Sequence, residues 1–147
     1  MYFVDSKTLN LKLNYLEQLT IDFEDVKQSP YALERVAHMM IESVVDVGNL
    51  IIDAFILRDP GNYKDVIDIM ELEKVFQPST AEEIKISIDY RKELTRNYEN
   101  IDHDALRKAF EQATPYYKQA IADTKHFLDN ENVAITAFGE GGKNERL

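Results

Sequence analysis

A cluster of basic residues lies in the second half of the chain. The segment YRKELTRNYENID places Arg91, Lys92 and Arg96 within six positions, and Tyr98 follows closely. Guanidinium groups bind phosphate oxygens through paired hydrogen bonds, and an ammonium group adds a point charge. The cluster therefore predicts a phosphate-binding site. The alternative is structural: an ion-pair network, or a basic helix C-terminus favoured by the helix dipole.

The overall charge limits which ligand this cluster can serve. The 147 residues carry a formal net charge of −10. Broad, non-specific nucleic-acid binding relies on many Lys and Arg contacts to phosphates, so DNA is not an expected partner. One local cluster is nevertheless enough for a small RNA site, and RNA remains a candidate ligand.

A stripe of polar residues on the second predicted helix could face the basic cluster. Its members recur at spacings of seven, four, three and four, which puts them on one face: Arg35, Glu42, Asp46, Asn49 and Asp53. Most such stripes are solvated faces with local ion pairs. The other interpretation is the polar wall of a groove, in which Glu42 or Asp46 pairs with Arg91. Arg91 follows Ile84 by seven and should project from an apolar face, where an unpaired charge is costly.

Metal sites and the common nucleophile motifs are not indicated. Glu34 precedes His38 by four residues and Glu99 precedes His103 by four, whereas helical di-iron sites use a spacing of three. With three histidines and no cysteine, the chain is a poor candidate for zinc. The late GEGGK segment lacks the spacing of a phosphate-binding loop. We therefore expect neither a metal nor a cofactor.

The sequence also gives an expectation for the compartment. The absence of cysteine fits a reducing environment. MYFVDSKTLN lacks the basic and apolar regions of a signal peptide. No apolar run approaches the roughly 20 residues of a membrane span. We expect a cytoplasmic protein with no membrane partner.

Helical periodicity dominates the rest of the chain and predicts an all-α fold. The expected helices are about 6–27, capped by Asp5 or Ser6, then 30–58, 63–75, 80–99 opened by a Thr80–Glu83 capping box, and 103–127. Such helices pack most simply as an up-and-down bundle of four to five helices. We expect one domain over residues 1–129 and a flexible tail over 130–147.

Two residues within these helices are unusual. Pro115 should kink or break the last helix because it removes a backbone donor. Gly48 lies in the middle of the second helix, where it costs about 1 kcal/mol relative to alanine. A close approach by another helix would explain this glycine.

The run SPYALERVAHMMIESVVDVGNLII, followed at the expected distance by YRKELTRNYENID, resembles the HepT-like family of the HEPN superfamily. The MYFVD start and the leucine-rich helix after it resemble one branch of that family. The resemblance covers most of the chain except the tail. It implies a HEPN-like bundle, a homodimer, and a toxin that is paired with a small nucleotidyltransferase antitoxin.

The family motif is an arginine, four to six residues, a histidine and then a tyrosine, commonly RNxxxHxY. Arg91 matches the arginine and Tyr98 the tyrosine, but Lys92 replaces the asparagine and Arg96 the histidine. Members with the intact motif are metal-independent RNases in which the histidine moves protons and the arginine stabilises the phosphate. Because arginine stays protonated, Arg96 can hold a phosphate but cannot act as a general base. The resemblance thus implies an RNA-directed protein with weak or lost cleavage. The alternative is a non-catalytic dimeric module that binds a partner or a nucleotide.

A shifted register offers another catalytic histidine. Arg96 is followed after six residues by His103, which fits the loose spacing of the motif. Tyr98 and the Ile101-Asp102 pair favour the register through Arg91, and His103 is then an exposed residue at a helix start. In the resembling toxins the partner enzyme attaches AMP to the motif tyrosine, which implies Tyr98 as a modification site. The alternative role for Tyr98 is an interfacial aromatic side chain.

Overall fold

The computed structural model describes residues 5–131, and every element there is helical. The elements are α1 (Ser6–Val26), α2 (Pro30–Phe55), α3 (Tyr63–Leu72), α4 (Pro78–Ile88), the short α5 (Arg91–Thr95), the 3₁₀ turn η1 (Tyr98–Asn100) and α6 (His103–Asn130). The all-α prediction is confirmed. Most of the predicted tail, residues 132–147, and most of the MYFVD start lie outside the described residues. None of the helices in the described part could cross a membrane.

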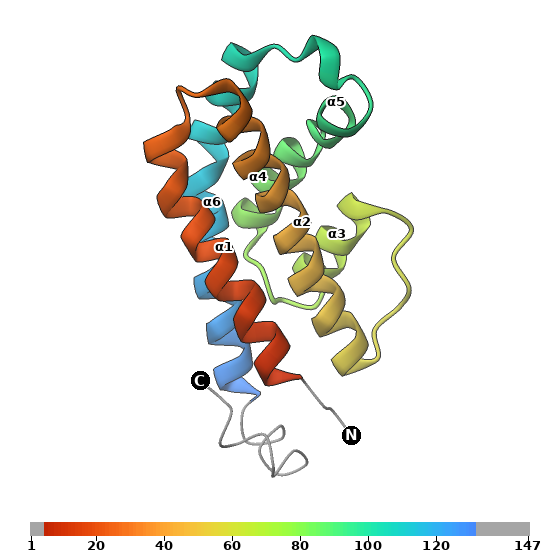
Figure 1. Ribbon diagram of the computed structural model, residues 1–147. Helices are drawn as coiled ribbons and strands as arrows, with labels where there is room; N and C mark the ends of the chain where they lie inside the picture. Colours follow the sequence, from red (N-terminus) through yellow and green to blue (C-terminus); the bar gives the residue numbers. More distant parts are fainter. Residues whose placement is uncertain (1–4, 132–147) are drawn as a thin grey trace.

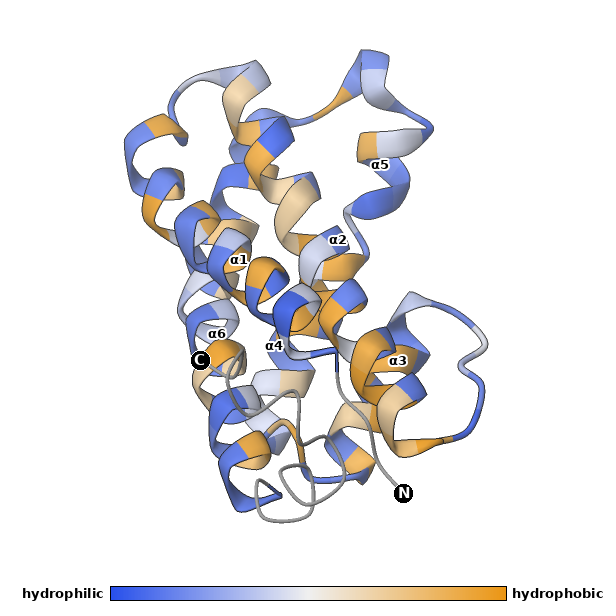
Figure 2. Ribbon diagram, turned by 60° about the horizontal axis from the view of Figure 1, so that its bottom comes forward, coloured by the Kyte–Doolittle hydropathy of each residue, from blue (hydrophilic) through white to orange (hydrophobic). Residues whose placement is uncertain are grey.

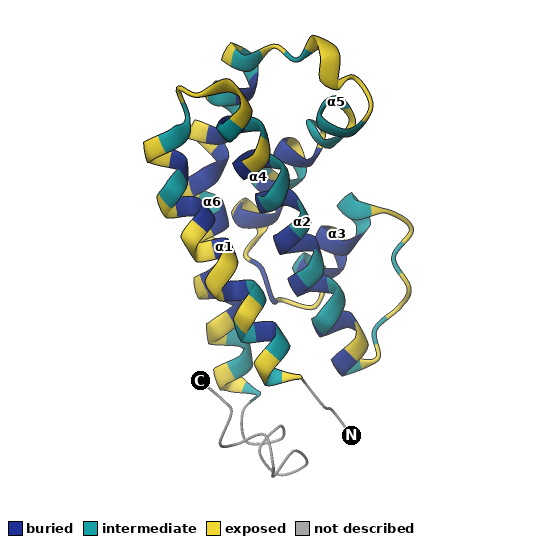
Figure 3. Ribbon diagram, viewed as in Figure 1, coloured by how far each residue is buried: buried dark blue, intermediate teal, exposed yellow. Residues whose placement is uncertain are grey.

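The four long helices alternate in direction. In Figure 1, α1 and α2 run antiparallel, α4 returns toward the end at which α2 begins, and α6 runs back beside α1. α6 contacts α1, α2 and α4, whereas α3 packs against α2 and α4. Hydrophobic and hydrophilic residues alternate along these helices (Figure 2), and the inward faces are buried (Figure 3). This is the up-and-down bundle that the sequence predicted, with α3 added between α2 and α4.

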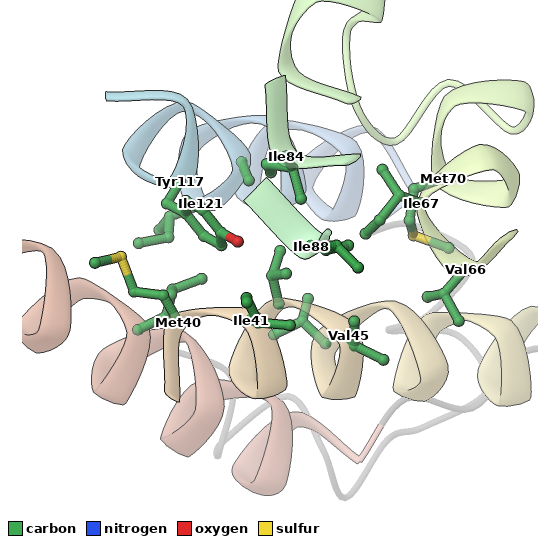
Figure 4. Packing of buried hydrophobic residues seen from close by; sticks show 14 of the residues in the cluster. Met40, Ile41, Val45, Val66, Ile67, Met70, Ile84, Ile88, Tyr117 and Ile121 are labelled. Carbon is green, nitrogen blue, oxygen red and sulfur yellow. The ribbon is translucent and has the colours of Figure 1, made fainter. Parts of the chain in front are cut away.

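α2 forms the centre of the core because its apolar stripe faces three other helices. Ser29 precedes it and Pro30 occupies its first turn, as predicted. Figure 4 shows Met40, Ile41 and Val45 of α2 facing residues of α3, α4 and α6. The facing residues that the figure labels are Val66, Ile67, Met70, Ile84, Ile88, Tyr117 and Ile121.

Gly48 allows α3 to approach α2 closely. A Cβ atom added at Gly48 would overlap Cγ1 of Val66 and would lie 3.6 Å from Cγ of Met70. Val66 and Met70 are both buried. The predicted close approach by another helix is confirmed, and the partner is α3.

The predicted capping box at the start of α4 is wrong. α4 begins at Pro78, and Gln77 is its N-cap residue. Thr80 is buried and donates to Oδ2 of Asp123 over 3.1 Å, and the backbone N–H of Gln77 donates to the same oxygen over 3.0 Å. The first turn of α4 is therefore capped by a carboxylate of α6 rather than by its own threonine.

The helix that begins near Thr80 does not persist to Tyr98, because α4 ends at Ile88. Near this end, the Ser87 hydroxyl donates to the carbonyl of Ile84 over 2.7 Å and lies 2.7 Å from the hydroxyl of buried Tyr117. The N–H of Tyr90 then bonds to the Ser87 carbonyl, which tightens the last turn. The chain turns and starts again as α5, so the basic cluster occupies a short helix of its own.

The other helix ends differ from the predictions by a few residues. α2 ends at Phe55 rather than near residue 58, with Ile56 in the left-handed region at φ 55°. α3 ends at Leu72 rather than at Val75. α6 starts after Asp102, whose side chain caps it as predicted, and it runs to Asn130 without a break at Pro115.

Candidate functional site

The basic cluster lines a cavity between α5 and the start of α3. This cavity has a volume of about 410 Å³ and is lined by Asn62, Tyr63, Lys64, Ile88, Asp89, Arg91, Lys92, Thr95 and Arg96. The structure thus brings Arg91, Lys92 and Arg96 together, as the phosphate-site prediction requires. Lys64 adds a fourth cation and pairs with Asp89 at 2.5 Å. Figure 3 shows that α5 is only partly buried.

Arg91 is held by residues from two other helices. Its Nε donates to Oε2 of Glu42 on α2 over 2.9 Å, and its guanidinium carbon lies 4.2 Å from the ring centroid of Tyr63 on α3. The predicted pairing of Arg91 with an acid of the second helix is therefore confirmed for Glu42. Arg91 is not buried, however, because 39% of its side chain is exposed. Glu42 engages Nε, and the guanidinium also lies against Tyr63.

Glu42 is the centre of this small network. Its Oε1 accepts from the Tyr63 hydroxyl over 2.7 Å, and its Oε2 accepts from Arg91 and lies 3.2 Å from Nε2 of His38. Burial raises the pKa of Glu42, but the hydrogen bonds from Tyr63 and Arg91 outweigh it, and the pKa lies below its ordinary value. Glu42 is therefore ionised at neutral pH and acts only as an acceptor.

The protonation states of the neighbours fit this arrangement. Burial and the hydrogen bond to Glu42 both raise the pKa of Tyr63, so its hydroxyl keeps its proton. The hydrogen bond to Glu42 raises the pKa of Arg91, although burial opposes it. A protonated phenol and a charged guanidinium thus share one carboxylate.

Two members of this network, His38 and Tyr63, were not predicted from the sequence. His38 precedes Glu42 by four residues, which places the two side chains on the same helix face. The spacing of four could therefore have predicted the contact between His38 and Glu42. No sequence spacing could have predicted Tyr63, because its approach to Glu42 depends on how α3 packs against α2.

Tyr98 does not share a face with Arg91. α5 ends at Thr95, and Tyr98 begins the 3₁₀ turn η1. Tyr98 does not line the cavity, and 65% of its surface is exposed. Arg96, the C-cap residue of α5, does line the cavity and is exposed.

His103 lies outside the cavity. It is the first residue of α6, and its Nε2 lies 2.6 Å from Oε2 of Glu34 on α2. Glu34 precedes Glu42 by eight residues, or about 12 Å along a helix. The prediction of a simply exposed residue is wrong, because 31% of the His103 side chain is exposed and it has a partner.

The remaining residues of the predicted polar wall do not reach α5. Asp46 pairs with Lys12 of α1 at 3.0 Å. Arg35 is exposed and Asn49 is half-buried, and neither side chain forms a hydrogen bond or ion pair with another residue in the range 5–131. Only Glu42 of the stripe contributes to the cavity network. In the same range, no group of three or more His, Cys, Asp or Glu side chains could hold a metal ion.

Three comparisons with known proteins identify the family and the fold. The family described as Ribonuclease HepT-like matches residues 10–123. A protein of Bacillus subtilis (strain 168) named "Putative RNase YutE" is 37% identical over 146 residues, covering 94% of this chain and 99% of the relative. A solved structure of YutE from Bacillus subtilis, described as a cytosolic protein of unknown function, superposes with a TM-score of 0.84 at 34% identity. The superposition covers 89% of this chain and 95% of the YutE chain.

Proposed function

The chain belongs to the Ribonuclease HepT-like family, and on this premise we propose that it binds RNA and cleaves it weakly without a metal ion. In this proposal Arg91, Lys92 and Arg96 hold RNA phosphates. The observation that carries it is their convergence on one cavity in a chain whose net charge is −10. The relative named as an RNase is consistent with this assignment.

Arg91 has the main role at the phosphate. Charge develops on the phosphoryl oxygens as the phosphodiester is attacked, and a fixed cation stabilises it. Glu42 and Tyr63 fix the guanidinium before RNA binds. Arg96 adds positive charge but supplies no base at neutral pH. Since general acid–base catalysis contributes about 10²–10⁴-fold, cleavage should be slow compared with that of members with the intact motif.

The proposal includes the partners that the family resemblance implies. The protein acts as a homodimeric, cytoplasmic toxin component, and a nucleotidyltransferase antitoxin silences it by attaching AMP to Tyr98. The 65% exposure of Tyr98 supports access by such an enzyme, and the description of YutE as cytosolic supports the compartment. Analytical ultracentrifugation tests the dimer. Mass spectrometry after incubation with ATP and a minimal nucleotidyltransferase tests the modification, which Tyr98→Phe should abolish.

The test of the central proposal uses purified protein with transfer RNA and total RNA in EDTA. We expect slow cleavage by the wild type and none by Arg91→Ala. Arg96→His should cleave about 10²-fold faster than the wild type, because it adds a proton-transfer group to the cavity lining. Lys125→Ala is the control, because Lys125 is an exposed residue in the last turns of α6 and does not line the cavity.

RNA binding, measured by fluorescence anisotropy, distinguishes the alternative. A wild type that neither binds nor cleaves RNA would contradict the proposal and favour a non-catalytic HEPN-type module that binds a partner or a nucleotide. Arg91→Ala that stays folded and binds RNA as the wild type does would contradict the assigned phosphate site.

A further inference from the structure

We infer that His38 is the proton acceptor of this site and serves in place of the histidine that is missing at position 96. The inference rests on the proposed function. It explains how a chain with Arg96 in the motif can retain RNA cleavage.

The geometry places His38 beside the phosphate-binding arginine. Nε2 of His38 lies 3.2 Å from Oε2 of Glu42, and Nε of Arg91 lies 2.9 Å from the same oxygen. The imidazole and the guanidinium are therefore at most two hydrogen-bond lengths apart. His38 is half-buried and is not among the residues that line the cavity, so the proposed step requires the ribose beside an Arg91-bound phosphate to reach beyond that lining.

The hydrogen bond to Glu42 leaves Nδ1 of His38 as the base. Because Glu42 is ionised and accepts only, the N–H of neutral His38 is on Nε2 and the lone pair is on Nδ1. Nδ1 bonds to no other residue in the described part of the chain. No buried side-chain nitrogen or oxygen there lacks a hydrogen-bond partner, so Nδ1 reaches solvent. A carboxylate on one nitrogen and an open lone pair on the other is the usual arrangement of a catalytic histidine.

The other two histidines do not fit this role. His103 pairs with Glu34. His126 lies near the end of α6, in a second cavity with Asp123 and Phe76, away from the basic cluster. Among the three histidines of the chain, only His38 shares a hydrogen-bond partner with Arg91.

The proposed step is a transesterification within the RNA. Nδ1 of His38 takes the proton of a ribose 2′-hydroxyl, and the 2′-oxygen bonds to the adjacent phosphorus while Arg91 stabilises the phosphoryl oxygens. The bond from phosphorus to the 5′-oxygen breaks, and the leaving oxygen takes a proton from water. The imidazolium returns its proton to the hydroxide that remains. The products are a 2′,3′-cyclic phosphate and a 5′-hydroxyl end.

The test compares His38→Gln with the wild type in EDTA. Glutamine can still donate to Glu42 but supplies no base near neutral pH. We expect cleavage to fall about 10²-fold or more while the RNA dissociation constant changes less than about twofold. His126→Gln is the matched control and should cleave at the wild-type rate. Added imidazole should restore part of the activity of His38→Ala, which a purely structural role would not allow.

The outcomes separate this inference from the proposed function. Cleavage by folded His38→Gln at the wild-type rate would overturn the inference and leave the RNase proposal intact. A wild type that binds RNA through Arg91 but does not cleave would also overturn it. Loss of RNA binding by the wild type itself would remove the proposed function. Should His38→Gln not fold, as shown by circular dichroism, the imidazole response of His38→Ala decides.

Discussion

The ring of Tyr63 stacks against Arg91, with the guanidinium carbon 4.2 Å from the ring centroid. The hydroxyl of the same ring donates over 2.7 Å to Glu42, which also accepts from Arg91. Tyr63 therefore supports Arg91 twice, once through its face and once through their common carboxylate.

Two substitutions of Tyr63 should separate these contributions. Tyr63→Phe keeps the ring and removes a hydrogen bond to a charged acceptor, which should lower the free energy of unfolding by about 1–2 kcal/mol. Tyr63→Leu also removes the cation–π contact, worth about 0.5–1 kcal/mol at a partly exposed site. The affinity for RNA should be highest for the wild type, lower for Tyr63→Phe and lowest for Tyr63→Leu. Urea unfolding and anisotropy measure the two effects, and equal RNA affinity in all three would contradict the support role.

The cationic cavity should show a defined salt dependence. Each phosphate contact to single-stranded RNA contributes about 0.7 to the slope of log K against log salt. Lys92 lines the cavity and is exposed. Lys92→Ala should therefore reduce the magnitude of that slope by about 0.7, as measured by anisotropy at several salt concentrations. Lys125→Ala should leave the slope unchanged, and an unchanged slope in Lys92→Ala would place Lys92 outside the RNA contact.

Acid should weaken the loop between α2 and α3. The hydrogen bonds from Arg58 and from the backbone of Gly61 lower the pKa of Asp65 from 3.8 to about 2. Since the folded state holds this proton less tightly, the carboxylate stabilises the fold above about pH 4. That contribution is lost as the pH falls toward 2. The Tm difference between wild type and Asp65→Asn should be largest above pH 4 and vanish near pH 2.

Gly48→Ala should be destabilising despite the better helix propensity of alanine. Overpacking against buried Val66 costs about 1–3 kcal/mol, and the propensity gain offsets about 1 kcal/mol. We expect a lower urea midpoint for Gly48→Ala and recovery in the double variant with Val66→Ala. At Gly61 a Cβ would make an ordinary contact of 3.7 Å with Asp65, so Gly61→Ala should be nearly neutral. Equal urea midpoints for Gly48→Ala and the wild type would show that α3 can shift away from α2 and accommodate the added methyl group at no cost in stability.

His103→Ala should affect stability and not catalysis. Its partly buried bond to Glu34 ties the start of α6 to α2, and its loss should cost about 1 kcal/mol. Because His103 pairs with Glu34 and shares no hydrogen-bond partner with Arg91, RNA cleavage should stay within about twofold of the wild type. Loss of cleavage in a folded His103→Ala protein would favour the shifted register of the motif.

The sequence was sufficient for features that depend on local periodicity. The apolar stripe of α2, the Ser29-Pro30 start and the Asp102 cap all follow from residues close together in the chain. Even the pairing of Arg91 with an acid of α2 followed from the cost of an unpaired charge on an apolar face.

The features that were missed depend on contacts between distant residues. The end of α4 depends partly on Ser87, whose hydroxyl bonds within its own turn and lies beside the hydroxyl of Tyr117 on α6. The start of α4 depends on Asp123. Likewise, Tyr63 reaches Glu42 only because α3 folds back against α2. Neither helix propensity nor capping rules contain such information.

The capping of α4 has a consequence for the synthesis of the protein. The carboxylate that caps this helix belongs to Asp123, which is made 46 residues after Gln77 and 43 after Thr80. A nascent chain that has emerged only as far as Arg96 already contains the basic cluster, yet it lacks the carboxylate that accepts from Gln77 and Thr80 at the start of α4. The contacts that hold the start of α4 therefore form only after α6 has been made as far as Asp123. On the proposed function, we expect the unfinished chain to lack RNA cleavage until that part of α6 is present.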